Sequence, residues 1–136
     1  MPTHEEVLGE LKRLAQIHVD TSKRIAGLDF DYSAASMNLL DPMIESSWGA
    51  NPPTQLDAIV QIFGAYLGEV LVRTLDGRWA EKDGRWVVEI SLPNGDTAQA
   101  NVFYKVQKRF ENGMEDSLGY YYAVMKKVHE EGMPAV

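Results

Sequence analysis

The sequence predicts a single α+β domain over residues 1–136, in which a three-stranded antiparallel meander at about 78–102 packs with helices on both sides of it in the chain. Two observations lead to this fold class. Before and after the middle of the chain, apolar residues recur every three or four positions, which is typical of helices with one buried face. Between these segments, apolar residues alternate with polar ones around the turn sequences Asp83-Gly84 and Asn94-Gly95-Asp96, as in strands joined by hairpins.

The first helix is expected at about 4–26. Thr3 and Glu6 have the spacing of a capping box, and Gly27 supplies a stop. His18 falls on the apolar side of this helix, where a packed and hydrogen-bonded histidine is a simpler interpretation than a ligand or a base, because no partner is adjacent.

A second helix is expected at about 34–46, with Ser33 as its cap. Pro42 lacks an N–H group and should kink this helix or restart it with Asp41 as a new cap. The third helix is expected at about 54–75, and its apolar residues cover most of its circumference, which predicts the central helix of the domain.

Two glycines, Gly64 and Gly68, lie inside this third helix. Glycine in a helix costs up to about 1 kcal/mol relative to alanine, so the pair indicates a place where another backbone, helix or sheet packs closely.

In the meander, a two-residue Asp83-Gly84 loop places Trp79 and Trp86 on one sheet face, which should be buried. A three-residue loop at 94–96 would pair Leu92 with Ala98 and Ile90 with Ala100, keeping the apolar residues of both strands together.

Two further helices are expected at about 102–111, with Asn101 as a cap, and at about 115–131. The second contains Tyr120-Tyr121-Tyr122, which point in three directions about 100° apart, so at least one phenol should reach the surface. We take Tyr120 as a candidate interaction residue.

Composition limits the classes of function. A net charge of -7 disfavours nucleic-acid and anionic membrane partners and would attract a cationic one, although such a charge is also common for solubility. No cysteine is present, which excludes disulfides and thiolate sites. No basic and apolar leader and no membrane helix is recognised, so a cytoplasmic protein is expected.

Glu69 is the strongest candidate for a chemical role, because a carboxylate among apolar neighbours has a raised pKa. Arg73 lies four residues further on and could pair with it, which would make Glu69 structural. The histidines have no metal-ligand spacing and no phosphate-binding loop occurs, so we expect no catalytic residue, no metal site and no cofactor.

The chain combines several short motifs in a distinctive order: Asp31-Tyr32-Ser33 before a helix with Leu40-Asp41, then Gly64-x-Tyr66-x-Gly68-Glu69-Val70, Trp79 in a hairpin, and Asp116-Ser117-Leu118 before a tyrosine-rich helix. This order resembles small bacterial domains of unknown function over about residues 29–128. Pro42 departs from the pattern, whose corresponding helix usually continues. The resemblance implies no activity.

The leading hypothesis is a non-enzymatic protein-interaction or regulatory module, with a toxin-neutralising role as one form of it. The alternative is a small-molecule-binding protein or hydrolase, with a pocket between the Glu69 helix and the sheet face of Trp79 and Trp86. In that pocket the candidate residues are Tyr66, Glu69, Arg73, Trp79 and Trp86. The chain is expected to be a monomer or a weak homodimer, and self-association through the last helix is a third possibility.

Overall fold

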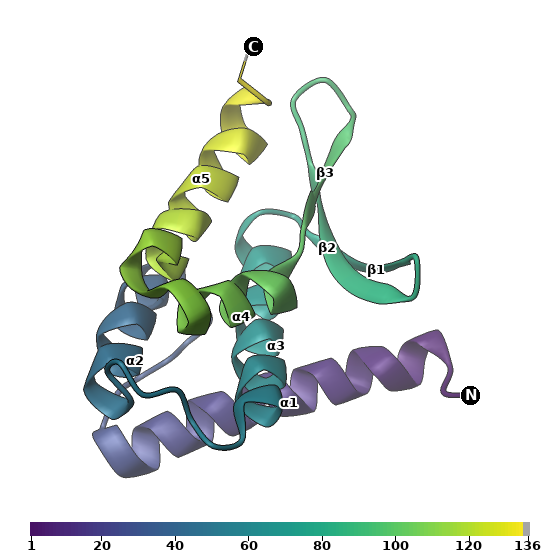
Figure 1. Cartoon of the computed structure of the whole chain (residues 1–136). Coiled ribbons are helices and arrows are strands. Elements are labelled where there is room, and N and C mark those ends of the chain that lie inside the picture. The colour runs from purple at the N-terminus through teal and green to yellow at the C-terminus, as the bar shows by residue number, and fades with distance from the viewer. Residues whose placement is uncertain (135–136) are drawn as a thin grey trace.

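The computed structural model describes residues 1–134, which form an α+β fold (Figure 1). The elements follow in the order α1 (His4–Ala26), η1 (Ala35–Leu39), α2 (Leu40–Ser47), α3 (Leu56–Thr74), β1 (Arg78–Lys82), β2 (Arg85–Ser91), β3 (Thr97–Ala100), α4 (Val102–Asn112), η2 (Gly113–Asp116) and α5 (Leu118–Glu131). The predicted fold class is confirmed, with one antiparallel sheet in the order β1-β2-β3 and helices on both sides of it in the sequence.

Helix α3 is the centre of the core, as its apolar sequence predicted. Every residue from Phe63 to Leu71 is buried. The long helix α1 crosses α3 and packs Leu11, Ala15 and His18 against the core, while α4 lies across another side of α3 (Figure 1). Helix α5 and the β2–β3 hairpin rise from the same side of this helical body (Figure 1).

The two glycines of α3 make room for aromatic rings, not for a neighbouring backbone. A Cβ atom on Gly64 would lie 2.3 Å from a ring carbon of Phe103, and one on Gly68 would lie 2.1 Å from a ring carbon of Trp79. The two rings stack on each other, with their centroids 5.9 Å apart. The expectation of close packing is therefore correct in position, but the groups that approach are side chains of α4 and β1.

The start and end of α1 follow the sequence prediction. Thr3 and Glu6 form the reciprocal capping box, and Gly27 ends the helix with a φ of 65°. The break near Pro42 is also confirmed, because a 3-10 helix runs to Leu39 and α2 begins at Leu40.

The predicted cap Asp41 and the predicted start of the third helix are both wrong. Asp41 makes no cap for its own helix, since its carboxylate is bonded to the start of α5. The predicted helix start at 54 is also too early, because α3 begins at Leu56 and Gln55 makes no side-chain cap.

The β1–β2 hairpin has the predicted register. Trp79 lies opposite Val88 and Lys82 opposite Arg85. The loop residues Asp83 and Gly84 have φ values of 53° and 77°, as a tight two-residue hairpin loop requires.

The predicted register between β2 and β3 is wrong by two residues. Ile90 lies opposite Ala98, whereas Ala100 lies opposite Val88. Because the shift is an even number, each side chain keeps its face of the sheet, and Val88, Ile90 and Ala100 are all buried as expected.

The cause of this shift is Pro93, which cannot donate to the strand ladder. The three-residue loop is Pro93-Asn94-Gly95, closed by the Leu92 N–H donating to the Asp96 carbonyl at 2.8 Å. Proline suits the first central position of such a turn. Gly95 follows in the left-handed region at φ 92°.

The last predicted helix begins three residues later than expected, because residues Gly113–Asp116 form a separate 3-10 turn. Ser117 caps α5 by accepting a bond from the Tyr120 N–H. Tyr120 is 72% exposed and Tyr122 is buried, so the prediction that a phenol of this run reaches the surface is confirmed. Within residues 1–134, no helix combines the length and apolar character needed to cross a bilayer.

Candidate functional site

Glu69 is buried on α3, and both of its carboxylate oxygens have partners. The indole N–H of Trp79 donates to Oε2 at 2.8 Å, and the Arg73 guanidinium lies 3.3 Å from Oε1. Glu69 therefore pairs with Arg73, as their spacing on the helix suggested. Trp79 is an additional partner that the helical spacing alone could not show.

The candidate residues Tyr66, Glu69, Arg73 and Trp79 belong to one connected group, which we call the Glu69 cluster. Tyr32 completes it: the Arg73 guanidinium lies 3.6 Å above the Tyr32 ring, and that ring stacks on Tyr66 at 5.1 Å. The Tyr66 hydroxyl accepts a bond from the Tyr32 N–H. These contacts join α3 to β1 and to the chain before η1.

His18 lies beside this cluster in the aromatic core, packed by the rings of Phe30, Phe63 and Tyr66 at 4.3 to 4.8 Å. Its Nδ1 is 3.5 Å from the Ser22 hydroxyl, but its Nε2 has no hydrogen-bond partner among residues 1–134. The prediction of a packed histidine is confirmed, although only one ring nitrogen is bonded. Burial lowers the pKa of His18 to about 4.

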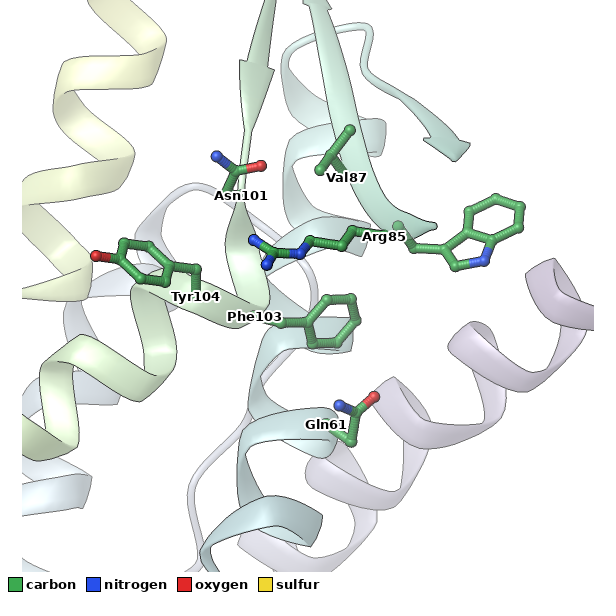
Figure 2. Close-up of a pocket in the computed structure, with 7 residues that line it drawn as sticks. Gln61, Arg85, Val87, Asn101, Phe103 and Tyr104 are labelled. Atoms are coloured by element: carbon green, nitrogen blue, oxygen red, sulfur yellow. The ribbon is translucent and has the colours of Figure 1, made fainter. Parts of the chain in front are cut away.

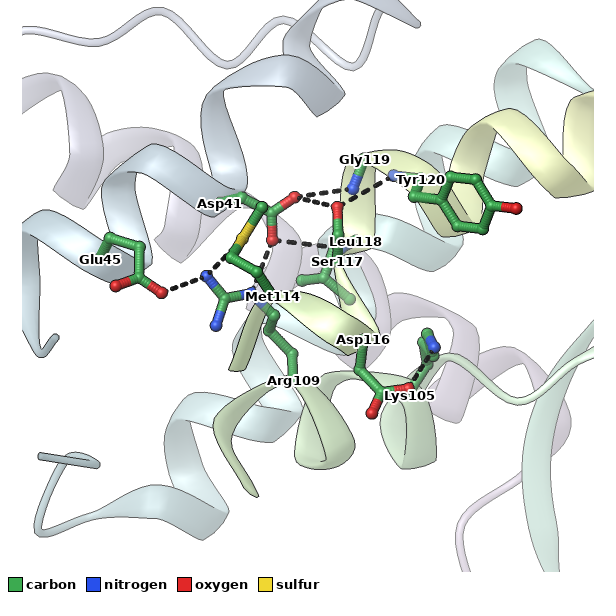
Figure 3. A network of polar contacts seen from close by, with 10 residues as sticks. All are labelled: Asp41, Glu45, Lys105, Arg109, Met114, Asp116, Ser117, Leu118, Gly119 and Tyr120. Atoms are coloured by element: carbon green, nitrogen blue, oxygen red, sulfur yellow. Dashed lines mark hydrogen bonds and ion pairs between the residues drawn. The ribbon is translucent and has the colours of Figure 1, made fainter. Parts of the chain in front are cut away.

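A second buried polar group, the Asp41–Arg109 cluster, joins α2, α4 and α5 (Figure 3). Arg109 is 2% exposed, and its guanidinium donates to Asp41 at 2.7 Å and to Glu45 at 2.8 Å. The Met114 sulfur lies 3.3 Å from the same guanidinium. An arginine this deeply buried is stable only when its donors are paired.

Asp41 uses its remaining acceptor sites on the start of α5. It accepts bonds from the Leu118 N–H, the Gly119 N–H and the Ser117 hydroxyl (Figure 3). Burial by itself would raise the pKa of Asp41, but these bonds and the one from Arg109 outweigh it, so the pKa is lowered. A carboxylate at a helix N-terminus also interacts favourably with the helix dipole. The Asp41–Arg109 cluster therefore holds helices α2, α4 and α5 together.

An open groove lies between α3, α4 and the start of β2, and we call it the Arg85 groove (Figure 2). It consists of two adjoining hollows of about 510 and 310 Å³ that share Gln61, Arg85, Phe103 and Tyr104. The larger hollow is completed by Trp86, Val87 and Asn101. The smaller is completed by Asp57, Val60 and Gln107.

The floor of the groove depends on the glycine at position 64. Because Gly64 has no side chain, the Phe103 ring can lie directly against α3, and it also stacks on Trp79. Val87, on the sheet face opposite Val88, is also buried and lines the larger hollow. The floor is thus apolar and firmly packed.

The rim of the groove carries polar side chains. Figure 2 shows the Arg85 guanidinium directed into the space between Asn101, Phe103 and Tyr104. Within residues 1–134, Arg85 forms no ion pair, although Arg78, which precedes the other tryptophan of the sheet, pairs with Glu89 at 3.2 Å. Asn101 was predicted to cap α4, but it makes no side-chain cap, so that prediction is wrong and its amide faces the groove.

The sequence indicated only one residue of this groove, Trp86, whose ring lies 4.9 Å from that of His4. Tyr120 is remote from it on α5 and lines neither hollow. Arg85 directly follows the Asp83-Gly84 turn, which is a recognisable position in the sequence. Asp-Gly-Arg-Trp occurs twice, at 76–79 and at 83–86, so the sequence did not show that the two arginines have different surroundings.

In the described part of the chain, no three His, Asp or Glu side chains are grouped so that they could hold a metal ion. Comparisons with protein-family models, with curated proteins and with solved structures found no match.

Proposed function

We propose that this protein is a non-enzymatic interaction module that binds a polypeptide segment of a partner protein in the Arg85 groove. The observation that supports this most is the groove itself: it is open, continuous over two hollows, and has an apolar floor with a polar rim. Regulation of the partner, or neutralisation of a toxin, are activities that such binding allows.

The composition of the rim suits a peptide. Gln61, Asn101 and Gln107 offer amide groups that can both donate to and accept from a peptide main chain. Tyr104 is 57% exposed at the edge. Tyrosine and arginine are enriched among residues that contribute most to protein–protein binding.

The buried clusters support a non-enzymatic function. The oxygens of Glu69 and Asp41, the two carboxylates most enclosed by the fold, already accept bonds from Trp79, Arg73 or Arg109. A general acid or base must reach a substrate proton, and these two groups instead hold secondary-structure elements together.

A random peptide library displayed on phage tests this proposal. Gln61 is exposed in the middle of the groove, so Gln61→Trp should fill the groove without disturbing the core. Peptides selected on the wild-type protein are expected to lose binding to this variant by at least about tenfold. The matched control is Lys12→Trp on the exposed side of α1, which should retain binding.

The proposal fails if selection yields no binding peptide, or if the selected peptides bind Gln61→Trp as tightly as the wild type. Circular dichroism of both variants should match the wild type, which separates blocked binding from loss of the fold.

Small-molecule binding is a second candidate, because the larger hollow of about 510 Å³ has a size common for ligand sites and is lined by Trp86 of the sheet and Gln61 of α3. The predicted centre of that site, Glu69, is not among the lining residues of either hollow. Native mass spectrometry of the purified protein tests this candidate: a retained small molecule that is lost in Gln61→Trp would support it over peptide binding.

A further inference from the structure

We infer that the Arg85 groove selects a segment in which an acidic residue lies next to an apolar or aromatic one. This inference rests on the proposed function, because it names the chemistry of the segment that the groove binds. The carboxylate would pair with Arg85, and the apolar side chain would lie on the floor formed by Phe103 and Val87.

The first argument is charge. Arg85 is exposed and has no ion pair within the described residues, whereas Arg73, Arg78 and Arg109 each have a carboxylate partner. A guanidinium offers two parallel N–H donors that match a carboxylate, and such bonds are stronger than those between neutral groups. A carboxylate supplied by a ligand would give Arg85 the partner that residues 1–134 do not provide.

The second argument is position. Arg85 lines both hollows, so a carboxylate bound to it would lie at the middle of the groove. Asp57 lines only the smaller hollow and would repel the same carboxylate if it moved there. Phe103 lines both hollows, but the larger hollow adds the apolar side chains of Val87 and Trp86 and has no acidic lining residue, whereas the smaller adds only Val60 beside Asp57. This arrangement sets the order of the two ligand groups along the groove.

The third argument limits the number of acidic residues. The chain has a net charge of -7, which repels a uniformly acidic partner over distances of about the Debye length, ~10 Å at 0.1 M salt. A single carboxylate within an otherwise neutral or basic segment avoids this repulsion and still satisfies Arg85. The expected ligand is therefore an acidic–apolar pair in a segment that is not acidic overall.

Nuclear magnetic resonance titration with three defined peptides tests this inference: acetyl-Phe-Glu-Ala-amide, acetyl-Phe-Gln-Ala-amide and acetyl-Phe-Lys-Ala-amide. The readout is the shift of the side-chain amide signals of Gln61, Asn101 and Gln107. The Glu peptide should bind about tenfold more tightly than the Gln peptide, and the Lys peptide should bind most weakly.

Variants of Arg85 show whether this preference comes from the guanidinium. In Arg85→Gln the Glu and Gln peptides should bind equally, and in Arg85→Lys part of the preference should remain, because lysine keeps the charge without the two parallel donors. Lys12→Gln changes the net charge equally on α1 and should keep the full preference.

Two results would overturn different statements. Equal binding of the Glu and Gln peptides to the wild-type groove would contradict the preference for a carboxylate and leave peptide binding intact. If none of the peptides shifts the groove amides at millimolar concentration, groove binding itself is contradicted.

Discussion

Arg109 and Arg85 are the same residue type in opposite surroundings. Arg109 is buried between α2, α4 and η2 and has two carboxylate partners, while Arg85 is exposed at a groove and has none within residues 1–134. The guanidinium is well suited to both positions, since it remains charged and offers five donors. The contrast shows which polar groups serve folding and which remain available for binding.

The difference extends to the regions around the two arginines. Arg109 and Glu69 each have at least one partner from another element, Asp41 for Arg109 and Trp79 for Glu69, so the fold itself uses their hydrogen-bonding capacity. Around Arg85, Phe103 packs against α3, and the side-chain amides of Gln61 and Asn101 have no hydrogen-bond partner within residues 1–134. The Gln107 amide donates only to Glu111 of its own helix, at 3.1 Å. A binding site requires a firmly packed floor beside polar groups that can form hydrogen bonds with a ligand.

The largest expected effect on stability comes from replacing Arg109, the buried arginine of this comparison. Arg109→Met should lower the free energy of unfolding by about 3–5 kcal/mol, because it leaves Asp41 buried without its charged partner. Urea denaturation measures this. The control Lys108→Met lies on the same helix, where its exposed pair with Glu111 should contribute less than about 1 kcal/mol. Similar losses in both variants would contradict a structural role specific to Arg109.

The second prediction concerns His18 and the pH dependence of the free energy of unfolding. Its pKa of about 4 in the folded protein is below the ordinary value of 6.5, so the unfolded chain takes up the proton first as the pH falls. The stability contributed by neutral His18 is complete above pH 6.5 and is lost between pH 6.5 and 4, by about 3 kcal/mol.

His18→Leu should remove most of this loss. Urea denaturation at several pH values gives the slope of stability against pH for both proteins. The lowered pKa of Asp41 acts in a separate window, because its contribution disappears as the pH falls below the ordinary value of 3.8. An equal loss between pH 6.5 and 4 in wild type and variant would contradict the role of His18.

A smaller effect on stability is expected from replacing Gly68, which makes room for the Trp79 ring. Gly68→Ala would place a Cβ atom 2.1 Å from the Trp79 ring and force that ring away from Glu69. This should cost about 1–3 kcal/mol, despite a gain of up to about 1 kcal/mol in helix propensity.

The matched control is Gly9→Ala in α1, where nothing lies within 4 Å of the added Cβ, so this variant should be stabilised by about 0.5–1 kcal/mol. Thermal denaturation followed by circular dichroism distinguishes the two. If both variants were stabilised, the close contact between α3 and Trp79 would be wrong.

The smallest effect is expected from Glu69→Gln. Glutamine retains an acceptor for the Trp79 N–H and loses only the charge opposite Arg73, whose side chain is 45% exposed. The loss should be about 1 kcal/mol or less in urea denaturation. Glu69→Ala also removes the acceptor and should cost clearly more, because it leaves the buried indole N–H unpaired. Equal costs would mean that Trp79 does not depend on this bond.

Local rules predicted much of this fold. The capping box at Thr3 and the Asp83-Gly84 hairpin involve residues close in sequence, and both formed as expected. The predicted β2–β3 register was wrong because two three-residue loops, 93–95 and 94–96, both place the same side chains inward. Only the position of Pro93 distinguishes them.

The candidate site was harder to predict for a related reason. Glu69 and Arg73 are four residues apart, so their pairing was visible in the sequence. Asp41 and Arg109 are separated by 68 residues, and neither has a local feature that indicates the other. The Arg85 groove brings together α3, β2 and α4, so its residues share no sequence pattern. Only the packed fold shows that, within residues 1–134, Arg85 has no carboxylate partner whereas Arg109 has two.

The most direct test of the contrast between the two arginines is a pair of measurements on Arg85→Met: its free energy of unfolding in urea and its affinity for acetyl-Phe-Glu-Ala-amide. The free energy should stay within about 0.5 kcal/mol of the wild type, while the affinity should fall by about tenfold. A loss of several kcal/mol in stability, or an unchanged affinity, would contradict the assignment of Arg85 to binding.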